Sequence, residues 1–115
     1  MSKYTDMYEK TMKMLAEKIQ SDESFRESVR EEYVLALSES ARCCYAYVDD
    51  DNEVHVAADF NIDYYRRHSF VILVAQYYTI IDDEDYNLDV DSNEEDIKTA
   101  AEIAANEFIE EYMRM

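Results

Sequence analysis

The sequence predicts a single, mainly α-helical domain, and three observations support this. A chain of 115 residues fits one domain with a modest core, here taken as 1–115. Nearly half of the residues are apolar, and eleven Tyr and four Phe accompany a net charge of −17, whereas disordered acidic chains are poor in aromatic residues. Apolar residues also recur at three- and four-residue steps, which is the period of a helix.

Three amphipathic helices are predicted, at about 3–20, 22–45 and 93–113. We expect the second to begin at a Ser21 hydroxyl cap followed by acids, which the helix dipole favours in a first turn. We expect the third to begin at a capping box made by Ser92 and Glu95. Its alanines would allow close packing of helices, and the Met residues at positions 7, 12 and 14 are expected to pack in the core.

The middle of the chain allows two interpretations. Cys44–Val48 and Val54–Val56 flank a turn rich in Asp and Asn, which is typical of a short hairpin. Residues 69–81 are β-branched and aromatic, so they fit a buried strand or a buried helix at about 62–80 equally well by periodicity. The alternative fold is therefore α+β, with a short antiparallel sheet drawn from 43–81.

The chain contains no Gly and no Pro. This excludes the phosphate-binding P-loop, the dinucleotide-binding glycine turn and the nucleophile elbow of α/β-hydrolases. Positions that need a positive φ must then be filled by Asn or Asp. The expected examples are Asn52, Asn61, Asn87 and Asn93.

No metal or cofactor site is predicted. Asp89, Asp91 and Asn93 copy the first ligands of a calcium-binding EF-hand loop, but Glu94 and Ala100 replace the required Gly and Glu. The two cysteines are adjacent at 43 and 44, which is not the spacing of a zinc or redox site. We expect them to be buried free thiols, with His55 and His68 outside any ligand set.

Catalysis and direct nucleic-acid binding are both disfavoured. No pattern places a base and an orienting carboxylate around a nucleophile, so the chain is not expected to be an enzyme. Arg66 and Arg67 follow two tyrosines, but residues 49–115 carry a net charge of about −15, which repels phosphate. We expect these arginines to pair with acids and stabilise the fold.

The negative charge is the dominant functional feature. Residues 82–96 contain nine acids and no base, and residues 49–63 contain six acids and no base. Duplex DNA carries one charge per about 1.7 Å, so seventeen charges correspond to roughly 30 Å of duplex. The sequence thus predicts a DNA mimic that occupies the DNA-binding channel of a basic DNA-binding protein or enzyme.

The predicted binding surface consists of acids from the two runs and from the last helix. They are Asp49, Asp50, Asp51, Glu53, Asp59, Asp63, Asp82, Asp83, Glu84, Asp85, Asp89, Asp91, Glu94, Glu95, Asp96, Glu102, Glu107, Glu110 and Glu111.

In length, charge and the opening segment Met7–Ile19, the chain resembles the Ocr-type antirestriction proteins of tailed phages. A helix ending in small residues and tyrosines near 41–48 is loosely similar too. The resemblance implies a largely helical homodimer of viral origin that mimics DNA and blocks a restriction enzyme. Other defence nuclease complexes, such as CRISPR effectors, also present basic channels and are alternative targets. It also favours the helical interpretation of 62–80.

The alternative function is that of an acidic adaptor or structural protein, which would bind a partner through a Tyr- and Met-rich apolar face. Lys3, Asp6 and Glu9 interrupt any apolar run near the N-terminus, so no signal peptide is predicted. The longest apolar run is also too short to span a bilayer. The expected compartment is the cytoplasm, of the host if the protein is encoded by a phage.

Overall fold

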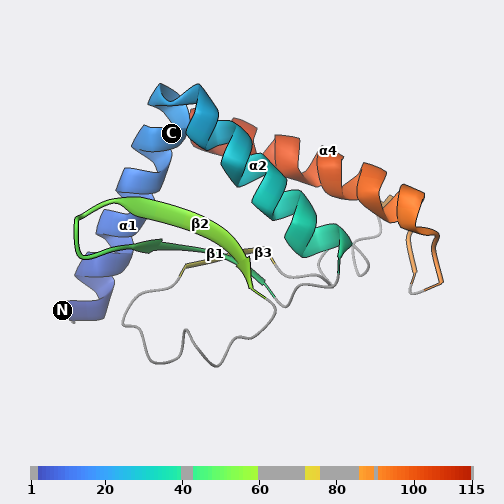
Figure 1. Cartoon of the computed structure of the whole chain (residues 1–115), viewed down its shortest axis with the longest axis horizontal. Helices are drawn as coiled ribbons and strands as arrows, with labels where there is room; N and C mark the ends of the chain where they lie inside the picture. The colour runs from blue at the N-terminus through green and yellow to red at the C-terminus, as the bar shows by residue number, and fades with distance from the viewer. Residues whose placement is uncertain (1–2, 40–42, 60–71, 76–85, 90, 115) are drawn as a thin grey trace.

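The computed structural model describes residues 3–39, 43–59, 72–75, 86–89 and 91–114. Within them the chain forms three helices and one sheet (Figure 1). The helices are α1 (Lys3–Ser21), α2 (Glu23–Ser38) and α4 (Glu94–Met113), and the strands are β1 (Cys43–Val48), β2 (Val54–Asp59) and β3 (Ile72–Ala75). The sheet is antiparallel with strand order β2-β1-β3. The mainly helical prediction is confirmed, in its α+β form.

One residue separates α1 from α2, and its side chain starts the second helix. The carboxylate of Asp22 accepts a hydrogen bond from the backbone N–H of Phe25 at 3.1 Å. The predicted Ser21 cap is therefore wrong: the Ser21 hydroxyl belongs to α1 and donates to the Glu17 carbonyl. A carboxylate is the better acceptor here because the positive end of the helix dipole attracts it.

The second helix is shorter than predicted. It ends at Ser38, and residues 43–45 lie in β1 instead of a helix. Tyr45 and Ala46 each pair with residues of both β2 and β3, so β1 is the central strand. Pairing on both edges outweighs the four-residue apolar stripe that suggested a continuing helix, because propensity is a weak prior against tertiary context.

The hairpin prediction is confirmed. Val48 pairs with Val54 and Cys44 with Ala58, so the strands enclose a short turn. Asn52 lies in this turn with φ 65°, and Asn87 has φ 51°, as the absence of glycine requires. Asn93 instead has φ −73° and is the N-cap of α4, while Asn61 lies outside the described residues.

The third strand corrects the expectation of a helix at 62–80. Ile72–Ala75 pairs with β1, with Ile72 opposite Ala46 and Leu73 opposite Tyr45. Ile, Leu and Val fit a pleated surface once a partner strand is present. The rest of the predicted helix lies outside the described residues.

Helices α1 and α2 contact the sheet, α4 lies against α2 and α1, and the core lies between these elements. Cys44 and Ala46, which share a face of β1, are fully buried among residues of α1, α2 and α4. The Cys44 side chain is buried, as predicted, whereas the side chain of Cys43 lies outside the described part of the chain. Figure 1 shows α2 beside α4, where Ala101 and Ala105 are fully buried.

The predicted start of α4 is shifted by one residue. The side chain of Asn93, not Ser92, accepts the N-cap hydrogen bond from Asp96 N–H at 2.8 Å. The Ser92 hydroxyl instead accepts from the N–H of Asp89 at 2.9 Å and closes the preceding turn. The predicted third helix, with acids in its first turn, is otherwise confirmed.

Candidate acidic interaction surface

The outer side of α4 carries a row of carboxylates. Its inner side is held by a buried stripe that includes Ile97, Ala101 and Ala105. Because a helix has 3.6 residues per turn, the opposite side of α4 faces outward. Of the predicted acids on this helix, Glu102 is half-buried and the others are exposed, namely Glu94, Glu95, Asp96, Glu107, Glu110 and Glu111.

Helix α2 extends this surface with acids that the sequence reasoning did not include. The Arg30 guanidinium donates to the Asn106 side-chain oxygen at 2.9 Å. Since Ser38 also lies beside Lys98, the two helices run antiparallel. Glu23, Glu27 and Glu31 are exposed on α2 at four-residue steps. That spacing is visible in the sequence, but the position of α2 beside α4 is not.

Few of these acids are neutralised within the described part of the chain. Three ion pairs occur there: Glu27 with Arg30 at 3.5 Å, Glu110 with Arg114 at 3.7 Å and Asp49 with His55 at 2.6 Å. In each of the first two pairs, both residues lie on the same helix or at its end, near the surface. Such a pair stabilises a helix by about 0.3–0.5 kcal/mol. Most of the negative charge in these residues is therefore directed at solvent.

A second acidic group lies in the β1–β2 turn. Asp49 accepts hydrogen bonds from the backbone N–H of Glu53 at 2.9 Å and from His55 Nε2 at 2.6 Å. Both bonds, the backbone one first, hold the pKa of the Asp49 carboxyl below its ordinary value. Asp50 and Asp51 are exposed beside it, as is the Glu53 side chain.

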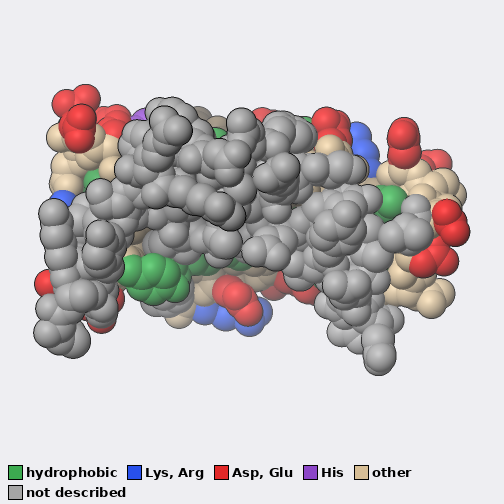
Figure 2. Space-filling view, turned by 90° about the horizontal axis from the view of Figure 1, so that it is seen from below, with side chains coloured by type: hydrophobic (Ala, Val, Ile, Leu, Met, Phe, Trp, Pro, Cys, Tyr) green, Lys and Arg blue, Asp and Glu red, His purple; other side chains and the backbone are tan. Residues whose placement is uncertain are grey.

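The acids are spread along the molecule instead of lining one pocket. In Figure 1 the β1–β2 turn lies at one end of the longest axis and the start of α4 at the opposite end. Figure 2 shows acidic side chains at both ends of the molecule. The molecule measures 42 × 31 × 24 Å. The acidic surface thus follows the long axis.

The turn before α4 contains the residues that imitate a calcium loop. One carboxylate oxygen of Asp89 accepts from the N–H of Asp91 at 2.8 Å, and the Asn93 side chain caps the helix. These oxygens serve the turn and the helix start. Asp89 and Asp91 are both exposed.

Several predicted site residues cannot be placed. Asp59 is the last residue of β2, but its side chain is outside the described part. The remaining acids, Asp63 and Asp82–Asp85, lie outside the described residues altogether, as do Arg66, Arg67 and His68.

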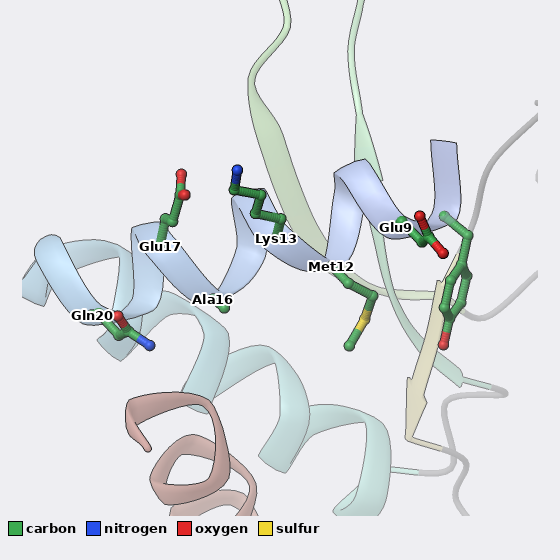
Figure 3. Close-up of a pocket in the computed structure, with 7 residues that line it drawn as sticks. Glu9, Met12, Lys13, Ala16, Glu17 and Gln20 are labelled. Atoms are coloured by element: carbon green, nitrogen blue, oxygen red, sulfur yellow. The ribbon is translucent and has the colours of Figure 1, made fainter. Parts of the chain in front are cut away.

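A shallow apolar groove runs along α1 (Figure 3). Tyr8, which is 51% exposed, lies at one end, and Met12 and Ala16 form its floor. Tyr112 donates its hydroxyl proton to the Met12 sulfur at 3.4 Å, and Gln20 donates to the Tyr112 carbonyl at 2.7 Å. These contacts fix α1 against the end of α4. Met12 and Met14 pack against the core, as predicted, and the Met7 side chain is not described.

No protein-family profile, curated protein or solved structure matches the chain. Among the described residues, no helix has both the length and the apolar character needed to cross a membrane.

Proposed function

We propose that the protein is a DNA mimic that inhibits a nucleic-acid enzyme by occupying its DNA-binding channel. The observation that carries the proposal is the extended distribution of unneutralised acids. The net charge of −17 is spread over a long axis of 42 Å. This is one charge per about 2.5 Å, compared with one per roughly 1.7 Å of duplex DNA.

The acidic helices suit this role because they are rigid. Helix α4 has 20 residues and is about 30 Å long at 1.5 Å per residue. The buried Ala101 and Ala105 hold it against α2, so the backbone positions that carry its carboxylates are fixed before a partner arrives. Fixed charges lose less conformational entropy on binding than the same charges on a flexible tail.

The proposed partner is a basic DNA-binding protein, such as a restriction, CRISPR or other defence nuclease complex in the cytoplasm. The negative charge of the protein accelerates its encounter with a basic partner. The same charge repels nucleic acid. The protein performs no reaction in this role and needs no cofactor. Dimerisation would double the length of DNA that is imitated.

Retention of a basic protein on the immobilised chain tests the proposal. Proteins from the lysate of the source cell are bound at low salt, eluted by a salt gradient and identified by mass. We expect the retained protein to elute well below 1 M salt and to be displaced by duplex DNA, because both ligands would use the same basic channel. Retention in 1 M salt without competition from DNA would contradict mimicry.

The groove on α1 favours a second candidate, an adaptor that binds an apolar partner. Residues 1–48 carry nine acids and seven bases, so this part of the molecule is nearly neutral. Exposed Tyr8 beside Met12 provides apolar contact area. In that case Tyr8→Ala would abolish retention while increased salt would not.

A further inference from the structure

The turn between β1 and β2 brings together three side chains that are separated in the sequence. Asp49 follows β1, Glu53 precedes β2, and His55 is the second residue of β2. One ligand atom from each of the three lies within 4.8 Å of the other two. No other group of this kind occurs within the described residues.

We propose that Asp49, Glu53 and His55 form a binding site for a divalent transition-metal ion, represented by Zn²⁺. An imidazole nitrogen and two carboxylate oxygens are common ligands of zinc. The imidazole decides the class of metal, because Mg²⁺ and Ca²⁺ prefer oxygen ligands.

The three ligand atoms lie within reach of a single metal ion, since all are within 4.8 Å of one another. Zn–N and Zn–O bonds are about 2.0–2.2 Å, so ligand atoms on a tetrahedral ion lie roughly 3.3 Å apart. Asp49 Oδ2 and His55 Nε2 are 2.6 Å apart while they share a hydrogen bond. Binding replaces the shared proton with the metal and separates this pair slightly. The Glu53 side chain is exposed and rotates freely enough to close the third side.

The surroundings of the site orient two of its ligands. The second oxygen of Asp49 accepts from the Glu53 backbone N–H at 2.9 Å, which fixes the carboxylate. The His55 ring stacks on Tyr47, with ring centres 5.2 Å apart. Outer contacts of this kind orient metal ligands and increase affinity. The exposed Asp50 and Asp51 raise the local concentration of cations without entering the ligand set.

Titration of the full-length protein with ZnCl₂ tests the proposal, with MgCl₂ as a parallel arm. Both are measured by calorimetry at 0.15 M NaCl, where screening weakens diffuse ion accumulation. We expect one Zn²⁺ site per chain that Mg²⁺ does not occupy. We expect His55→Asn to weaken Zn²⁺ binding by about tenfold or more, since even the loss of an outer contact costs 10–100-fold.

The matched control removes charge from the same turn without removing a ligand. The control double variant, Asp50→Asn with Asp51→Asn, removes two carboxylates that are not ligands. The test double variant, Asp49→Asn with Glu53→Gln, removes two carboxylates that are. We expect only the second pair to abolish the site. In the wild type, Zn²⁺ should also shift the ¹⁵N resonance of His55 Nε2, which reports ligation even if a variant fails to fold.

Three results would overturn the proposal. The first is equal Zn²⁺ affinity in wild type and His55→Asn. The second is equal loss of affinity in the two charge-matched double variants, which would indicate only diffuse attraction by the acidic turn. The third is an unchanged His55 resonance at saturating Zn²⁺.

Discussion

At the scale of single residues, the side chains that join helices matter more to the fold than the surface ion pairs. Arg26 donates from Nε to the Ile19 carbonyl at 2.8 Å and from Nη2 to the Gln20 carbonyl at 3.2 Å. The last carbonyls of a helix have no partner within it. Arg26 on α2 donates hydrogen bonds to these carbonyls of α1 and thereby fixes the angle between the two helices.

Arg26→Ala should lower the free energy of unfolding by about 1–3 kcal/mol, because it leaves the partly buried Ile19 carbonyl without its charged donor. Arg114→Ala is the control, since Arg114 makes only an exposed pair with Glu110 and backbone contacts at the end of α4. Urea unfolding at pH 7 measures both. Equal losses in the two variants would show that the Arg26 contact does not stabilise the junction.

Tyr33 should make the protein sensitive to alkali. Its ring stacks on Phe108 at 4.6 Å, and burial, followed by nearby ionisable groups, raises its pKa from 10.0 to about 12. Between pH 10 and 12 the unfolded chain releases the Tyr33 proton while the folded chain retains it. The contribution of Tyr33 to the free energy of unfolding is therefore complete below pH 10 and is lost as the pH rises towards 12.

Tyr33→Phe keeps the ring and removes the ionisable group. We expect the unfolding free energy of this variant to fall less steeply than that of the wild type between pH 10 and 12. Urea unfolding at intervals across this range, referenced to pH 7 for each protein, measures the difference. Parallel curves would mean that Tyr33 does not titrate differently in the folded and unfolded states.

At the scale of elements, a helix or strand was predictable from the sequence where local contacts stabilise it, and not where contacts with distant segments do. Helices α1 and α4 were predictable because their apolar stripes are local, although the cap of α4 is Asn93 and not Ser92. The end of α2 and the third strand were not, because β1 also pairs with β3, which lies far along the chain. The stripe from Leu37 to Cys44 fits a helix equally well, and only tertiary pairing decides.

The candidate site was predictable only in part. The acidic runs were visible in the sequence, and so were the glutamates of α4. The contribution of α2 required the Arg30–Asn106 contact, and the approach of His55 to Asp49 required the register of the hairpin. Neither follows from spacing alone.

The packing of α2 on α4 should depend on small residues at the contact. Ala105→Leu adds bulk at a position with no exposed surface. Such overpacking typically costs about 1–3 kcal/mol. Thr99→Leu on the exposed side of α4 is the control and should change stability by less than about 0.5 kcal/mol. Thermal and urea unfolding compare the two, and a tolerated Ala105→Leu would disprove close helix contact there.

At the scale of the whole molecule, stability and the proposed function make opposite demands on charge. The net charge of −17 favours capture of a basic partner but repels itself in the compact state. The near-neutral N-terminal part and the apolar core offset this repulsion. Most exposed acids have no cationic neighbour among the described residues, so their mutual repulsion is not relieved there. A cationic partner would relieve it.

The most direct test compares two variants that lose the same charge from different places. Glu102→Gln, Glu107→Gln and Glu110→Gln together remove three acids from α4. Asp6→Asn, Glu9→Gln and Glu17→Gln remove three from α1, where all three are exposed. Affinity for the retained DNA-binding protein is measured for both at two salt concentrations. DNA mimicry by the acidic surface predicts that the α4 variant loses affinity by tenfold or more and depends less on salt, while the α1 variant binds nearly as the wild type does. Equal affinities of the α4 variant and the wild type would contradict it.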